Sequence, residues 1–119
     1  MGEEVKMAYL VTVAPGDSAR METMLGYALA GRALGYETLI FYALDSALIT
    51  KRSILDKAEP KVKERIIEAL KEGVRIAVCS ASAKTFNITS ADVVPGVEII
   101  GIAAFYDFAE HSKITLTWS

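Results

Sequence analysis

The stretch KMAYLVTVA, residues 6–14, decides the fold class of this chain. It is apolar almost throughout, which is typical of a strand that is covered on both faces of a parallel sheet. Three further runs have the same character and occupy residues 37–44, 74–79 and 97–104. A last strand is predicted at 114–118, so the sheet is expected to contain about five strands.

Helical segments separate the predicted strands. The first helix is expected to begin near Ser18, which suits an N-cap, and to end before Gly35. The second is expected to begin at Pro60 and to end at Gly73, with a charged outer face. Residues 45–59 have an interrupted helical spacing and are predicted to form a short helix or excursion. The alternation of buried strands with helices predicts an α/β fold, with a mostly parallel sheet and helices on both of its faces.

The size and composition of the chain limit the classes of function. With 119 residues it is expected to form one domain, residues 1–119, around a single core. Hydrophobic residues make up 52% and the mean hydropathy is +0.31, an excess that suggests buried interfaces in a homo-oligomer. The net charge of −2 comes without a basic stripe, so no nucleic acid partner is expected.

The sequence also bears on the compartment. Its apolar runs are shorter than the roughly 18 to 20 residues that a bilayer-spanning helix needs, so no membrane partner is expected. The acidic opening, Met1 to Glu4, is unlike a signal or transit peptide, which predicts a cytoplasmic protein. The chain contains no Gln and one Asn, while Glu and Lys crowd the second helix, a bias that hints at a thermophilic source.

The only cysteine stands in RIAVCSASAKTF, residues 75–86, where an apolar run gives way to small polar residues. One cysteine forms no internal disulfide, and no Cys/His cluster has the spacing of a zinc site, so neither a metal nor another cofactor is expected. Cys79 ends the third predicted strand, and open α/β sheets bind ligands outside the carboxyl ends of their strands. Backbone N–H groups from Ser80 to Ser82 would then hold an anionic sulfur adduct, and Lys84 would add positive charge.

The same residues also have structural explanations. Cys79 would suit the core as a small buried hydrophobe, while Ser80 and Ser82 would cap a short helix. Lys84 alone would simply be solvated. His111 suggests a Cys-His protease, but no activating constellation is evident, so a surface role is favoured.

Three further groups of residues receive structural interpretations. The turn PGDSAR, residues 15–20, opens on the same crevice as Cys79, but helix capping is favoured for Asp17 and Ser18. The glycines of the first helix lack the G-x-G-x-x-G spacing after a strand, so close packing is favoured over nucleotide binding. Three aromatic side chains near the crevice are favoured as core residues rather than as a shield for a reactive sulfur: Phe86, Phe105 and Tyr106.

Two segments together resemble a known family. GVRIAVCSASAKTFNI, residues 73–88, and GVEIIGIAAFYDFAEHSKITL, residues 96–116, are similar to the DsrE/DsrF-like family of small sulfur-relay proteins. The resemblance implies a three-layer α/β/α sandwich that assembles into trimers or hexamers. It also implies that Cys79 carries sulfur as a persulfide or thiosulfonate and passes it to a partner thiol, often that of a small TusA-like carrier. Some family members use a second cysteine, and because this chain has none, release through an internal disulfide is excluded.

The sequence therefore leads to hypotheses from different classes. The leading hypothesis is a sulfur carrier or sulfurtransferase in which Cys79 accepts sulfur from thiosulfate or a persulfide, with Ser80, Ser82 and Lys84 positioning the adduct. The alternative is a non-catalytic oligomeric interaction module of the same fold with a buried, structural Cys79. A third hypothesis is a thiol sensor that forms a sulfenic acid with peroxide.

Overall fold

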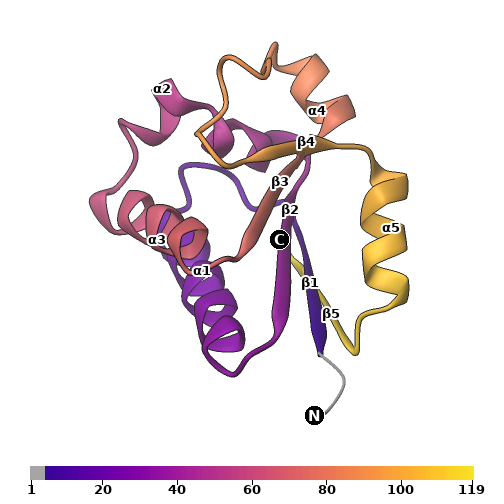
Figure 1. Cartoon of the computed structure of the whole chain (residues 1–119). Coiled ribbons are helices and arrows are strands. Elements are labelled where there is room, and N and C mark those ends of the chain that lie inside the picture. Colours follow the sequence, from indigo (N-terminus) through magenta and orange to yellow (C-terminus); the bar gives the residue numbers. More distant parts are fainter. Residues whose placement is uncertain (1–4) are drawn as a thin grey trace.

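A computed structural model describes residues 5–119 (Figure 1). One sheet of five strands runs in the order β4-β3-β2-β1-β5, and every neighbouring pair is parallel. The strands are β1 (Lys6–Val11), β2 (Glu37–Tyr42), β3 (Arg75–Cys79), β4 (Glu98–Ile100) and β5 (Ile114–Trp118). The predicted α/β fold with a sheet of about five parallel strands is confirmed.

Helices lie on both faces of the sheet, which gives the three layers that were expected (Figure 1). The helices are α1 (Ser18–Ala33), the 3-10 helix η1 (Leu44–Thr50), α2 (Arg52–Leu55), α3 (Pro60–Lys71), α4 (Ser80–Thr85) and α5 (Ile102–Glu110). Helices α1 and α3 cover one face together, whereas α5 covers the other (Figure 1). The short helices η1, α2 and α4 gather toward the carboxyl ends of the strands, where Cys79 also lies (Figure 1).

Two cores lie on opposite faces of the sheet, because successive side chains of a strand point to opposite sides. The larger core joins the sheet to α1 and α3 and includes Tyr9, Ile40 and Met24. The smaller core joins the sheet to α5 and consists of Ala8, Leu39, Phe41, Ala77, Phe105 and Phe108. Cys79 shares the strand parity of Ala77 and packs against this smaller core. The thiol therefore belongs to the face that a single helix covers.

The structure corrects the fourth predicted strand. Residues 97–104 were expected to be extended, but β4 ends at Ile100 and α5 begins at Ile102. A short apolar run does not distinguish a strand from a buried helix by periodicity alone. Phe105 and Phe108 then lie three residues apart on the helix, on the side that is buried against the sheet. The first strand is also shorter than predicted and ends at Val11.

Asp17, rather than Ser18, caps α1. The Asp17 carboxylate accepts hydrogen bonds from the Arg20 guanidinium at 2.7 Å and from the Arg20 backbone N–H at 3.1 Å. These hydrogen bonds lower the pKa of the Asp17 carboxyl. Ser18 is the first residue of the helix. The capping role favoured for this turn is thus confirmed at Asp17, and the assignment of the N-cap to Ser18 is wrong.

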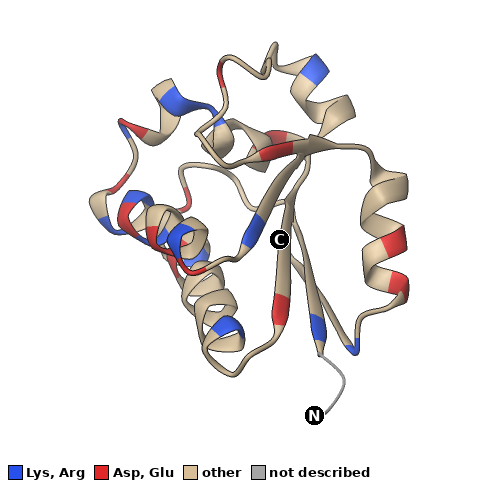
Figure 2. Cartoon of the chain, viewed as in Figure 1, with Lys and Arg blue, Asp and Glu red and all other residues tan. Residues whose placement is uncertain are grey.

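The two helices on the larger core differ in their outer faces. Figure 2 shows charged residues crowding α3, whereas α1 carries few. The predicted limits of α3 are confirmed, because Pro60 is its first residue and Gly73 follows its end with φ +88°. On α1, by contrast, Tyr27 is 56% exposed, and Leu34, at the C-cap of the helix, is 71% exposed. The outer side of α1 is therefore an apolar surface.

This apolar surface continues onto the sheet. The Tyr27 ring contacts the Trp118 ring of β5 edge-to-face, with 5.4 Å between ring centroids. Leu116 of the same strand is also exposed. We call the set Tyr27, Leu34, Leu116 and Trp118 the α1–β5 surface. Strand β5 is also an edge of the sheet, since β1 is its only partner among the described strands.

Candidate functional site

Cys79 lies at the carboxyl edge of the sheet. It is the last residue of β3, as predicted, and pairs with Ile100 of β4, while Val78 pairs with Tyr42 of β2. Neighbouring strands thus hold the end of β3 on both sides, and β4 pairs with Cys79 itself. Its side chain is half-buried. The thiol is therefore neither fully buried, as the interaction-module hypothesis expects, nor fully exposed.

The chain changes from strand to helix directly after the thiol. Cys79 occupies the N-cap position of α4, with φ −59° and ψ 125°. Its side chain makes no capping hydrogen bond, so the sulfur is not occupied in holding the helix. The N–H groups in the first turn of a helix have no acceptors within that helix. Backbone donors and the thiol therefore occur together in the chain, as the pattern of small residues after Cys79 predicted.

The three residues expected to position an adduct have different surroundings. Ser80 is exposed and faces the start of α5, since a Cβ on Gly101 would lie 3.6 Å from its Oγ. Ser82 is half-buried, and its Oγ accepts the backbone N–H of Leu44 at 2.9 Å. Lys84 is exposed in the last turn of α4, and Cys79 precedes that helix. Binding of sulfur by these side chains stays a prediction.

A pocket of about 410 Å³ lies beside α4 and η1. Its lining residues are Leu44, Asp45, Ala81, Ser82, Thr85 and Phe86, so Cys79 is not part of the wall. Sequence reasoning missed Leu44 because nothing in the residue type suggests its backbone conformation, which has φ +55°. Asp45 is exposed at the rim, and it follows β2 where a nucleotide-binding acid can stand. Without a glycine-rich phosphate loop, this position gives no support to nucleotide binding.

The structure excludes a Cys79-His111 pair. His111 follows α5 and precedes β5, so it lies toward the amino ends of the parallel strands, whereas Cys79 lies at their carboxyl ends (Figure 1). The His111 ring is exposed, and its Nδ1 is 2.9 Å from the carbonyl oxygen of Asp107. The surface role favoured for this histidine is confirmed.

The aromatic residues divide between core and surface. Phe105 is buried and stacks on Phe41 with 4.9 Å between ring centroids, which confirms its core role. Phe86 is half-buried and lines the pocket beside α4. Tyr106 is 62% exposed, so its assignment to the core is wrong. It lies on the side of α5 opposite the core, a distinction that the letters FYDF alone do not make.

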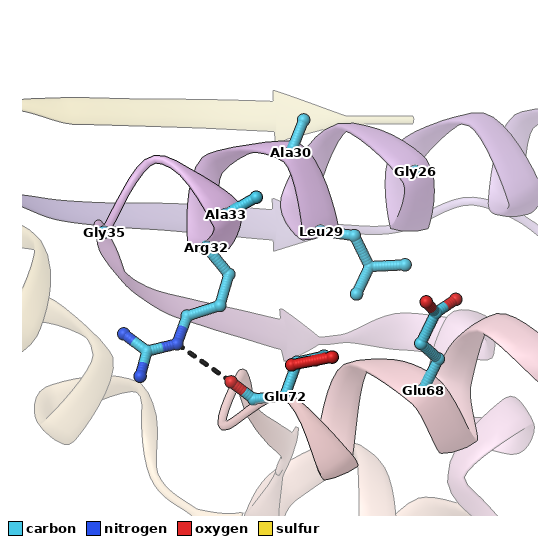
Figure 3. A pocket seen from close by; sticks show the side chains of 8 residues that line it. All are labelled: Gly26, Leu29, Ala30, Arg32, Ala33, Gly35, Glu68 and Glu72. Atoms are coloured by element: carbon cyan, nitrogen blue, oxygen red, sulfur yellow. Dashed lines mark hydrogen bonds between the residues drawn. The ribbon is translucent and has the colours of Figure 1, made fainter.

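A second pocket, of about 650 Å³, lies between α1 and α3 (Figure 3). Arg32 donates from Nε to the carbonyl oxygen of Glu72 at 2.9 Å, while Leu29 and Glu68 point into the space between the helices (Figure 3). A Cβ on Gly26 would lie 2.6 Å from the Arg65 guanidinium. Close packing therefore explains this glycine, as the sequence suggested. The pocket holds no nucleophile, and its arginine is already engaged.

Residues 5–119 also bear on metal and membrane sites. Within that range, no three His, Cys, Asp or Glu side chains come together as metal ligands would. None of its helices combines the length and apolar character that crossing a bilayer requires.

Comparison with known proteins adds a family and a fold. The profile of the DsrE/DsrF-like family matches residues 5–118. The uncharacterized protein MK0008 of Methanopyrus kandleri is 24% identical over 104 residues, covering 87% of this chain and 84% of that protein. The uncharacterized protein MJ0760 of Methanocaldococcus jannaschii is 26% identical over 83 residues, covering 66% of this chain but 30% of that protein. The chain therefore spans about a third of MJ0760.

Among solved structures, the YchN protein of E. coli superposes with a TM-score of 0.83 at 18% identity. The match covers 96% of this chain and 99% of YchN. At that identity the likeness establishes the fold.

Proposed function

Because the chain belongs to the DsrE/DsrF-like family, we propose that Cys79 carries sulfane sulfur and passes it to the thiol of a partner. The observation that supports this most directly is the position of the thiol. It is the only cysteine of the chain, it is half-buried at the carboxyl edge of a parallel sheet, and it makes no capping hydrogen bond to α4.

The proposed transfer is an exchange of sulfur between thiolates without an external oxidant. The Cys79 thiolate attacks the outer sulfur of a donor persulfide, forms a new S–S bond and releases the donor as a thiolate. With thiosulfate, the same attack on the sulfane sulfur releases sulfite and leaves a persulfide on Cys79. With tetrathionate, attack leaves a thiosulfonate adduct and releases thiosulfate. An acceptor thiolate then attacks the outer sulfur of the Cys79 persulfide, which restores the free thiolate.

The single cysteine determines how sulfur would leave. No second thiol of the same chain is present to displace the adduct, so the acceptor must come from another molecule. We propose a small carrier protein of the TusA-like class, or another exposed thiol, as that acceptor. Exchange of this kind needs a reduced thiol, which suits the cytoplasm, the compartment that we propose for the protein.

Mass spectrometry tests the proposal directly. Intact protein incubated with thiosulfate or tetrathionate should gain the mass of the corresponding adduct, and dithiothreitol should remove it. A peptide digest should place the gain on Cys79. The Cys79→Ser variant should fold as the wild type does and gain nothing. Wild-type protein that stays unmodified, under conditions that load an established carrier, would contradict the proposal.

We further propose that the chain assembles into a homo-oligomer, a trimer or hexamer, through the α1–β5 surface. The support is that the α1–β5 surface lacks charged residues and lies beside the exposed sheet edge at β5. Native proteins usually prevent pairing at exposed edges with charges, proline or short strands. Strand β4, the other edge, has three residues and contains Glu98, whereas β5 has five residues and no charge. Tyr27→Lys with Leu116→Lys should lower the mass measured by light scattering, while Lys61→Glu on the charged helix α3 should not. An unchanged mass in the double variant would refute this choice of surface.

The alternative function, a non-catalytic interaction module, predicts the same oligomer but an inert thiol. The packing of Cys79 against the smaller core is the observation in its favour. Reaction of native Cys79 with iodoacetamide separates the two functions. A thiol that reacts only after unfolding would favour the module, and a native thiol that reacts readily and also takes up sulfur would favour the carrier.

A further inference from the structure

The first residue of η1, Leu44, has an unusual backbone. Leu44 has φ +55°, a left-handed conformation that leucine rarely adopts because its Cβ approaches the following carbonyl. Its side chain is 62% exposed, so burial of the leucine does not account for the strain. Strained residues of this kind persist only where their surroundings hold them, and they cluster at functional sites. The contacts that hold Leu44 therefore indicate what the strain achieves.

Those contacts tie two parts of the carboxyl edge together. On one side of the residue, the Ala43 backbone N–H donates to the carbonyl oxygen of Val11 at 2.9 Å. The buried Ser46 hydroxyl also contacts the Val11 carbonyl oxygen, at 2.8 Å. On the other side, the Leu44 N–H donates to Ser82 Oγ at 2.9 Å, a bond between residues 38 positions apart. The left-handed turn thus presents a backbone N–H from η1 to the helix that starts directly after Cys79.

Helix α4 is short, so this bond is important for its placement. It has six residues, and Ser82 is its third. Ala83 is its only buried residue, so packing alone does little to fix the helix against the sheet. Ala43, next to Leu44, packs in the same smaller core as Cys79. A hydrogen bond from the neighbouring turn to the third residue of α4 therefore restrains the helix that begins directly after Cys79.

We infer that Ser82 and Leu44 together form a positioning link for Cys79. In this role Ser82 acts through the backbone of Leu44 and α4, and its oxygen is not a ligand of the sulfur adduct. This assignment differs from the sequence prediction, in which Ser82 held the adduct directly. The inference rests on the proposed function only where it concerns sulfur loading, since the position of a thiol can be followed without any sulfur donor.

A double-mutant cycle tests the link. The first measurement is the second-order rate of Cys79 alkylation by iodoacetamide in native protein, which requires no sulfur donor. Ser82→Ala leaves the Leu44 N–H without its acceptor, so we expect the alkylation rate to change roughly fivefold. Ser82→Thr keeps the hydroxyl and should restore the wild-type rate. Thr85→Ala, which removes a hydroxyl from the same helix outside the link, is the matched control and should leave the rate unchanged.

The second arm changes the other partner. Glycine adopts positive φ without strain, so Leu44→Gly no longer needs the Ser82 bond to hold the turn. In that background, Ser82→Ala should have much less effect on alkylation than it has in the wild type. Equal effects of Ser82→Ala in both backgrounds, or an equal effect of Thr85→Ala, would overturn the inference. If Ser82→Ala does not fold, Leu44→Gly and Leu44→Ala replace it. A lower melting temperature for Leu44→Gly than for Leu44→Ala would overturn the strained link.

The two proposals fail in different ways. The sulfur-loading rate with thiosulfate should fall about tenfold or more in Ser82→Ala, because small misplacements of a reacting group have large kinetic effects. If the wild type takes up no sulfur while the alkylation cycle shows coupling, the proposed function fails and the link stands. If the wild type loads sulfur but the cycle shows no coupling, the link fails and the carrier stands.

Discussion

The Tyr42 hydroxyl allows a sharp test of the packing beneath the site. Tyr42 ends β2 and is completely buried in the larger core, and its hydroxyl has no hydrogen-bond partner among the described residues. Burial raises the pKa of this hydroxyl far above its ordinary value, so it is neutral at every accessible pH. A buried hydroxyl without a partner has lost its bonds to water and gained none in return. Tyr42→Phe removes that oxygen and leaves the packed ring in place.

The expected change follows from the free-energy cost of the isolated hydroxyl. Leaving a buried polar group without a partner costs about 1 to 3 kcal/mol, and an isosteric apolar replacement recovers much of this. We therefore expect Tyr42→Phe to raise the free energy of unfolding by about 1 to 2 kcal/mol. For a chain of this size, each kcal/mol corresponds to roughly 4 °C in melting temperature. Gains from a single buried substitution are uncommon, since most substitutions destabilise.

Guanidinium chloride unfolding at pH 7 measures this gain, at one fixed protein concentration because an oligomer dissociates as it unfolds. Tyr9→Phe is the control. Tyr9 also lies in the larger core, but its hydroxyl is not among the buried atoms without a partner, so its loss should bring no comparable gain. A lower stability for Tyr42→Phe would refute the reasoning, because it would mean that the hydroxyl has a partner such as a buried water.

Three further predictions concern capping, pairing and turns. Hydrogen bonds from Arg20 lower the pKa of the Asp17 carboxyl. The cap of α1 therefore contributes its full stability above the ordinary carboxyl pKa and loses it as the pH falls through the lowered pKa. Asp17→Ala should lower the melting temperature at pH 7 but much less at pH 2. Hydrogen bonds from Arg75 likewise lower the pKa of the Glu98 carboxyl, and both side chains are 42% exposed. Glu98→Gln should therefore reduce the loss of unfolding free energy on acidification by no more than about 1 kcal/mol. The difference should be smaller at high salt. Gly73→Ala should cost about 1 to 2 kcal/mol in urea unfolding because φ is +88° there, and a neutral result would show that the turn rearranges.

The fold was predictable because the apolar pattern of the strands and the residues at the helix ends indicate the same elements. The strands at 37–44, 74–79 and 114–118 were correctly placed within two residues, since buried parallel strands are apolar on both faces. Pro60 marks the start of α3 because proline presets a helical φ, and Gly73 marks its end because glycine tolerates a positive φ. The error at 97–104 arose where Gly101 divides one apolar run into the end of a strand and the start of a helix. Only the tertiary structure separates them, because both halves are apolar.

The candidate site was predictable in position but not in detail. The end of β3 and the polar residues after it place Cys79 at the crevice from sequence alone. The bond between Leu44 and Ser82 was not predictable, because it depends on a left-handed leucine and joins residues 38 positions apart. No pattern of residue types signals such a conformation, since leucine is uncommon there. Ser82, which the sequence offers as a ligand of the adduct, accepts a hydrogen bond from the Leu44 backbone, and its contact with an adduct stays a prediction.

The partial exposure of Cys79 follows from strand parity and from unequal helix cover. Arg75, Ala77 and Cys79 alternate along β3 and so point to the face of α5. Ala77 is buried beneath that helix, but Cys79 lies half-buried at the rim of the smaller core, as do Leu10, Ala43 and its pairing partner Ile100. An apolar rim that stays partly wet is unfavourable in an isolated subunit. A partner that docks its thiol on Cys79 would bury this rim and exclude water from the exchanging sulfur, so truncation of Ile100 to Ala should weaken the partner's binding more than it slows loading by free thiosulfate.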